Sequence, residues 1–139
     1  MATRSFIGIR NTDDSVDYIY CHYDGYPAHN GAILTEHYNT IDKVKALLAL
    51  GDLSILGEEL GEKQDFNDRS THNEKWCLAY GRDRNEPNTR ARNDKYSEVI
   101  NDKGVDYAYV FDGDYWECFD TYGPVLINLY ETSKQEDII

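Results

Sequence analysis

The chain has 139 residues, of which 40% are hydrophobic and 13% aromatic, and its formal net charge is −12. This length fits one globular domain over residues 1–139 that buries a core without a metal or a disulfide, and the aromatic content argues against a disordered acidic chain. The negative charge argues against direct binding to nucleic acid or to an anionic membrane, and it suits a soluble protein, a basic partner or a cationic ligand.

The N-terminal part of the sequence predicts a hairpin followed by a tight turn. Side chains alternate over 5–10 and over 16–23, which predicts two strands joined by a turn rich in Asn and Asp. Asp24 and Gly25 indicate a tight turn after the second strand, and Pro27 suits the first position of a helix. The segment YCHYDGYPAHNG is therefore expected to connect a strand to a helix.

Helical spacing follows this turn. Apolar residues recur with the period of a helix over 28–39 and over 41–50. Thr40 is the expected N-cap of the second helix, and Gly51 is its expected end. We expect a further turn of helix over 52–60, capped by its first residue.

The rest of the chain divides into segments of different character. Polar residues without periodicity predict two loops, alternation predicts a strand and a hairpin, and helical spacing predicts a short helix. In chain order these are loop 61–74, strand 75–81, loop 82–94, helix 94–104 with Asn93 or Asp94 as its cap, hairpin 105–120, and a strand or helix over 123–134. Together these elements predict an α+β domain, in which an antiparallel β-sheet built from hairpins is covered by two to four helices.

The cysteines and the N-terminus indicate the cellular compartment. Cys21, Cys77 and Cys118 are widely spaced and odd in number, so we expect buried free thiols in a reducing environment. The first residues lack the apolar core of a signal peptide, and no apolar run approaches the roughly 20 residues that span a bilayer. A cytoplasmic protein without membrane contact is expected.

The charges are unevenly distributed along the chain. Five cations form a basic island: Arg82, Arg84, Arg90, Arg92 and Lys95. The island is either an anion site, since arginine matches phosphate and carboxylate, or a solvated loop whose arginines pair with the protein's own carboxylates. An acidic surface is expected from Asp106, Asp112, Asp114, Glu117 and Asp120. Carboxylates in a row can imitate the phosphates of DNA.

The strand-to-helix turn concentrates polar aromatic residues. Its candidates for contact with a ligand or partner are Tyr20, His22, Tyr23, Asp24, Tyr26 and His29. A metal site is disfavoured, because adjacent strand residues point to opposite faces and the spacing matches no zinc ligand set. The tyrosines either pack at the rim of the core or form a recognition surface, where they can stack on a nucleobase while Arg82 and Arg84 hold its phosphate.

Three sequence segments resemble a known group of proteins. YCHYDGYP, GDLSILG and RDR are similar to the pattern YCHxDGYP…GDLSxLG…RDR of small acidic, largely uncharacterised phage and prophage proteins, over about 4–129. The resemblance implies a setting rather than a chemistry: a phage protein in the host cytosol that acts on host machinery.

Three functions therefore stay open. The first is a phage-type accessory protein that binds and inhibits a host factor, as counter-defence, by acidic mimicry of nucleic acid. The second is a binding protein for a small nucleotide-like anion, which predicts that Tyr23, Tyr26, Arg82 and Arg84 converge on one pocket. The third is an unrecognised small hydrolase that uses groups of the same turn. Because no known catalytic motif is present, we favour a non-enzyme and assign no catalytic residue, metal or cofactor.

Overall fold

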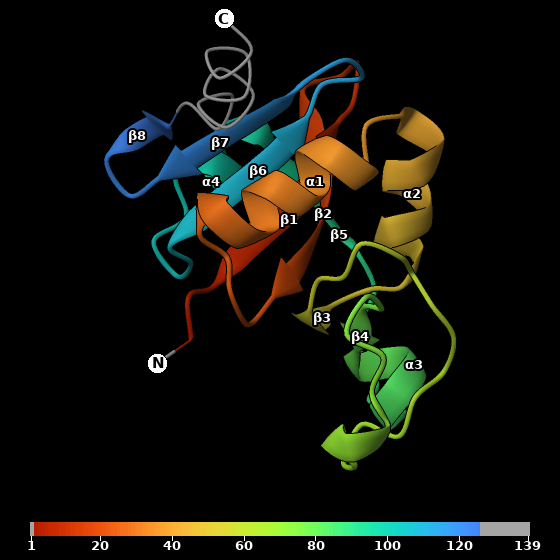
Figure 1. Ribbon diagram of the computed structural model, residues 1–139. Coiled ribbons are helices and arrows are strands. Elements are labelled where there is room, and N and C mark those ends of the chain that lie inside the picture. Colours follow the sequence, from red (N-terminus) through yellow and green to blue (C-terminus); the bar gives the residue numbers. More distant parts are fainter. Residues whose placement is uncertain (1, 126–139) are drawn as a thin grey trace, which may run out of the picture.

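Two hairpins form the centre of the sheet in the computed structural model, which describes residues 2–125. Strands β1 (Ser5–Arg10) and β2 (Ser15–Cys21) pair antiparallel as predicted, and so do β6 (Tyr107–Phe111) and β7 (Trp116–Asp120). The hairpins join along β1 and β6, which run parallel (Figure 1). The predicted α+β fold is confirmed, and the sheet is mixed rather than purely antiparallel.

Within the described residues, four short strands complete a sheet of eight. Strand β8 (Gly123–Val125) pairs with β7, and β4 (Leu78–Ala79) pairs with β3 (Leu53–Ile55), each antiparallel. The free side of β2 is shared, because β5 (Arg92–Lys95) pairs antiparallel with its first half and β3 runs parallel to its end. Strands β2 and β3 are parallel because the helices between them return the chain to the sheet in the same direction.

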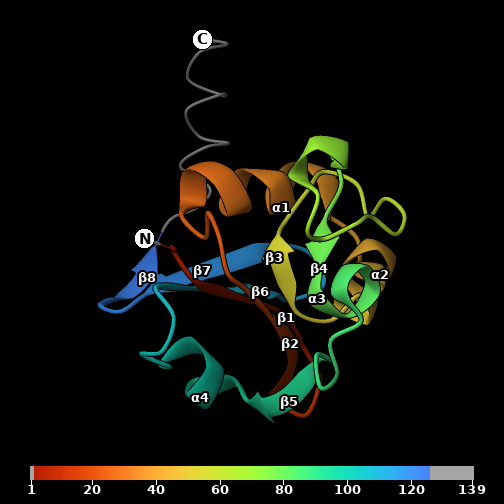
Figure 2. The ribbon, with the colours of Figure 1, turned by 90° about the horizontal axis from the view of Figure 1, so that it is seen from below.

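Helices cover both faces of the sheet (Figure 2). The π-turn η1 (Pro27–Gly31), α1 (Ala32–His37) and α2 (Ile41–Ala49) lie on one face, and α4 (Tyr96–Ile100) lies on the other. Helix α3 (Tyr80–Arg84) follows β4 at the edge of the sheet. Within residues 2–125, no helix is long and apolar enough to cross a membrane.

The two faces follow the period-2 alternation of the strands. Ile7, Ile19 and Tyr109 are fully buried and face α1 and α2, whereas Val16 and Val110 face α4. All three cysteines are buried and free, as predicted.

Local sequence signals identify α2 correctly. The Thr40 side chain accepts a hydrogen bond from the Lys43 backbone N–H at 3.3 Å. Gly51 then takes a φ of +77°, which a residue with a Cβ rarely adopts.

Three local predictions are wrong, because pairing with distant parts of the chain outweighs local preference. The segment 52–60 contains β3 in place of a helical turn. The segment 82–94 is not all loop, since it holds the end of α3 and the start of β5. Helix α4 is preceded by Lys95 in the N-cap position, without a side-chain cap.

Strand β8 begins the segment 123–134, and 126–134 lies outside the described residues.

Asp52 closes the gap between the two strands that share the edge of β2. Its carboxylate accepts a hydrogen bond from the Tyr20 backbone N–H at 2.9 Å and another from Arg92 Nη2 at 2.8 Å. Burial of this carboxyl raises its pKa, although the Tyr20 and Arg92 contacts oppose the shift. Asp52 therefore satisfies a strand N–H that neither β3 nor β5 reaches.

We expect Asp52→Ala to lower the free energy of unfolding by about 2 kcal/mol, since it leaves a part-buried N–H and Arg92 without this acceptor. Asp42→Ala, at an exposed position in the first turn of α2, is the control and changes stability by less than about 0.5 kcal/mol. Urea denaturation measures both. Equal effects would contradict this role of Asp52.

Candidate functional site

The Tyr-rich turn is fixed in place by its buried residues. Asn30 is fully buried, and its Nδ2 donates to Ser5 Oγ at 3.2 Å. The Tyr109 hydroxyl donates to the Gly25 carbonyl at 2.6 Å. Gly25 has no room for a side chain, since a Cβ there would lie 2.8 Å from the carbonyl oxygen of Thr3. The turn therefore presents its remaining side chains from a rigid base.

The outward side chains of the turn separate into different surroundings. Tyr23 is 45% exposed and Tyr26 is 39% exposed. The Tyr20 hydroxyl lies 2.7 Å from His22 Nδ1, and the Tyr26 ring contacts the ring of His29, with centroids 6.2 Å apart. Only Tyr23 and Asp24 of the predicted contact residues in this turn line the cavity described next.

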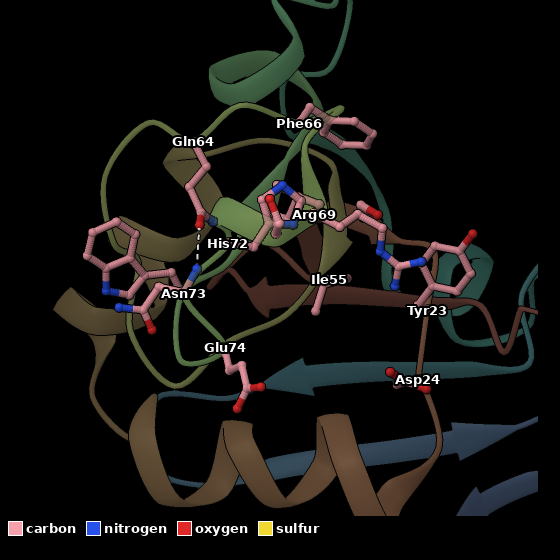
Figure 3. A pocket seen from close by; sticks show the side chains of 13 residues that line it. Tyr23, Asp24, Ile55, Gln64, Phe66, Arg69, His72, Asn73 and Glu74 are labelled. Carbon is pink, nitrogen blue, oxygen red and sulfur yellow. Dashed lines mark hydrogen bonds between the residues drawn. The ribbon is translucent and has the colours of Figure 1, made fainter.

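A half-open cavity of about 590 Å³ lies between this turn, β3 and the loop 61–76, and we call it the Tyr23 groove. Aromatic and charged side chains contribute much of its lining: Tyr23, Phe66, Trp76, Asp24, Arg69 and Glu74. Figure 3 shows the Arg69 side chain reaching toward Tyr23, whereas Asp24 and Glu74 lie nearer to α1. The groove thus has a cationic side at Arg69 and an acidic side at Asp24 and Glu74, and aromatic side chains also line it.

Polar contacts within the loop 61–76 orient the wall of the groove. Gln64 Oε1 accepts a hydrogen bond from the Asn73 backbone N–H at 2.8 Å (Figure 3), and its Nε2 donates to the Cys77 carbonyl at 3.2 Å. His72 Nε2 lies 2.7 Å from the Asp65 carbonyl oxygen. Since a carbonyl only accepts, Nε2 carries the proton and donates.

An ion pair between the buried Asp83 and the part-buried Arg82 holds this loop against the sheet. The Asp83 carboxylate accepts hydrogen bonds from the backbone N–H of Gln64 at 2.8 Å and of Ala79 at 2.7 Å, and from Arg82 Nε at 2.9 Å. Burial by itself raises the pKa of the Asp83 carboxyl, but these hydrogen bonds outweigh it and hold the pKa below its usual value. Asp83 is therefore a charged anchor between the loop and β4.

Arg82 extends the same anchor to two further points. Its Nη1 donates to the Leu60 carbonyl at 2.7 Å, and its Nη2 donates to the Cys77 carbonyl at 2.8 Å. These carbonyls lie at the two ends of the loop 61–76. Arg82 thus closes the base of the loop and does not line the groove.

Arg84 packs against Phe66, one of the side chains that line the groove. Its guanidinium carbon lies 4.5 Å from the ring centroid of Phe66 and 4.8 Å from that of Tyr80, and its Nη2 donates to Glu86 at 2.5 Å. The structure therefore does not bring Tyr23, Tyr26, Arg82 and Arg84 together in one pocket. Three arginines of the basic island, Arg82, Arg84 and Arg92, instead pair with carboxylates of the chain itself.

Four of the five predicted acidic residues accept hydrogen bonds within the fold, and two of these four, Asp112 and Asp120, accept them from residues of their own turns. Asp106 accepts from the Arg4 N–H, Asp112 from the N–H groups of Asp114 and Tyr115, and Asp120 from those of Tyr122 and Gly123. Glu117 accepts from the Tyr96 hydroxyl at 3.0 Å. Asp112 and Asp114 lie at the turn of the β6–β7 hairpin, whereas Asp106 and Asp120 lie at its other end, about 16 Å away for strands of five residues. These four aspartate carboxylates form two end groups, and Glu117 lies on β7 between them.

The groove residues of the loop 61–76 were not among the sequence-based candidates. Arg69, His72 and Phe66 come from the polar segment 61–74, whose lack of periodicity predicts only a loop, and Trp76 comes from the predicted strand 75–81. The length of this predicted loop could have indicated a functional segment, since structureless loops of this length are uncommon and often functional. Among the described residues, no three His, Cys, Asp or Glu side chains are placed to hold a metal ion.

We expect Asp83→Ala to lower the free energy of unfolding by about 3 kcal/mol, because it leaves Arg82 and two buried backbone N–H groups without their acceptor. Glu86→Ala removes the exposed partner of Arg84 on the same side of the fold and is the control, with a loss below about 1 kcal/mol. Denaturant unfolding measures both. A loss no larger for Asp83→Ala than for Glu86→Ala would show that the pair does not anchor the loop.

Comparisons with known proteins do not identify the groove. The chain matches no protein-family model, no curated protein and no solved structure. The resemblance to phage proteins through YCHYDGYP, GDLSILG and RDR stays a prediction. What the groove binds is therefore inferred below from its shape and its charges.

Proposed function

We propose that the protein is a binding protein whose Tyr23 groove captures a small nucleotide-like anion of the host. The pairing of an exposed tyrosine ring with Arg69 in one cavity carries this proposal. A ring of this kind stacks on any nucleobase, and a guanidinium matches phosphate oxygens. By removing such a molecule from a host pathway, the protein would act as a phage-type accessory factor.

The size and state of the groove support a small ligand. Its volume of about 590 Å³ lies within the range of small-molecule sites. Among residues 2–125, no hydrogen bond or ion pair engages the Arg69 side chain, which leaves its guanidinium available to a ligand. The buried anchor of Arg82 and Asp83 positions the wall before any ligand arrives.

The side chains of the turn do not favour a hydrolase. Burial raises the pKa of the Cys21 thiol to about 12, so this group is a poor nucleophile near neutral pH. His22 Nδ1 is in contact with the Tyr20 hydroxyl rather than with a nucleophile or a carboxylate. Binding without a reaction is the simpler function for these groups.

A second candidate function is inhibition of a basic host protein by the acidic body of the molecule. The net charge of −12 favours it. So do two tyrosines beside the end groups of the β6–β7 hairpin, Tyr115 at 67% exposure and Tyr122 at 97%, because exposed tyrosines are common in interfaces.

For the groove, we expect isothermal titration calorimetry with nucleoside monophosphates as probes, in both 5′ and 3′,5′-cyclic forms, to detect binding. Tyr23→Ala and Arg69→Ala each weaken binding at least about tenfold, because they remove the stacking ring and the anion contact. Tyr26→Ala is the matched control and leaves affinity unchanged, since this exposed tyrosine lies outside the groove. Absence of binding by every probe would refute the groove function.

For the second candidate, titration against DNA-binding host nucleases in rising salt is the direct test. We expect an affinity that falls steeply as salt rises, because screening weakens the attraction between opposite charges. Tyr122→Ala reduces binding if this end of the hairpin makes the contact. Binding to no nuclease, or binding that is indifferent to salt, would refute the electrostatic version.

A further inference from the structure

The charges inside the Tyr23 groove are not those of a polyphosphate site. Among the described residues, Arg69 is the single arginine or lysine of the groove lining, whereas Asp24 and Glu74 contribute two carboxylates. Within the described part of the chain, no hydrogen bond or ion pair engages either carboxylate. The negative charge of the whole protein, −12, adds to this field. Each further negative charge on a ligand is therefore repelled once Arg69 has been matched.

The positions of these groups define an orientation for a ligand. Arg69 reaches toward Tyr23 on one side of the groove, and Asp24 and Glu74 lie on the side nearer to α1 (Figure 3). An anionic group placed at Arg69 leaves a flat ring system beside Tyr23. Ligand hydroxyl or amine groups then face the two carboxylates, which accept hydrogen bonds from them.

The structure points to a singly charged ligand. Resting on the nucleotide function proposed above, we infer that the Tyr23 groove selects a phosphodiester of the cyclic-nucleotide kind over nucleotides that carry a phosphomonoester or a polyphosphate. A phosphodiester carries one negative charge, which Arg69 balances. A phosphomonoester approaches two charges at neutral pH, and a triphosphate carries more, so both place uncompensated charge beside Asp24 and Glu74.

The test compares ligands that share one base and one sugar. Calorimetry with 3′,5′-cyclic AMP, 5′-AMP and ATP, in EDTA so that no divalent cation neutralises the phosphates, measures the order of affinity. We expect cyclic AMP to bind at least about tenfold more tightly than ATP, with 5′-AMP between them. An ATP affinity equal to or greater than that of cyclic AMP would overturn the inference and leave the nucleotide function standing.

A matched pair of variants separates the groove from the overall charge. Glu74→Gln and Glu62→Gln remove the same charge from the same loop, but only Glu74 lines the groove. Glu74→Gln is expected to narrow the preference for cyclic AMP over ATP by about threefold or more, whereas Glu62→Gln leaves it unchanged. Equal effects would assign the preference to net charge and overturn the inference. If neither these three nucleotides nor the other nucleoside monophosphates bind to the folded protein, the proposed function fails and the inference fails with it.

Discussion

The ion pair between the part-buried Arg82 and the buried Asp83 is the contact on which the candidate site depends. Its carboxylate accepts from the N–H groups of Gln64 and Ala79, and its guanidinium donates to carbonyls at both ends of the loop 61–76. Burying two charges is costly, and the cost is offset only where hydrogen bonds satisfy both groups. Here those hydrogen bonds come from the loop at Gln64, from β4 at Ala79 and from the carbonyls of Leu60 and Cys77 that flank the loop, so the ion pair joins the loop to the sheet.

The groove consists of two rigid parts that face each other. On one side, the Tyr-rich turn is held by Asn30 and by the hydroxyl of Tyr109. On the other side, the loop is held by Arg82 and Asp83 and is supported behind Phe66 by Arg84. A site that is formed before its ligand arrives loses less conformational entropy on binding. This rigidity supports the ligand selectivity that we propose for the groove.

Features with local causes could be predicted from the sequence. The hairpins, the cap at Thr40 and the buried cysteines each follow from a short pattern. Strand β3 could not be predicted this way, because its conformation is decided by pairing with β2, more than 30 residues earlier. Nor does the sequence RDR reveal whether an arginine binds a ligand or its own neighbour. Arg82 bonds to Asp83, the next residue, and this choice depends on carbonyls that folding alone brings within reach.

The same limit explains why the groove is lined only partly by the residues predicted from the sequence. The sequence concentrates polar aromatic residues in the turn, and one of them, Tyr23, forms one wall of the groove together with Asp24. The opposing wall comes from a segment whose pattern shows neither strand nor helix. Arg69, rather than an arginine of the basic island, therefore supplies the cation of the groove.

Native-state hydrogen exchange of two backbone amides tests the central role of the ion pair most directly. The N–H groups of Gln64 and Ala79 donate to the same carboxylate of Asp83, one from the loop and one from β4. If the pair joins these segments, both amides are protected and exchange through the same opening event, with the same free energy. Rapid exchange at Gln64 while Ala79 stays protected would show that the loop moves independently of the sheet, and it would contradict this account.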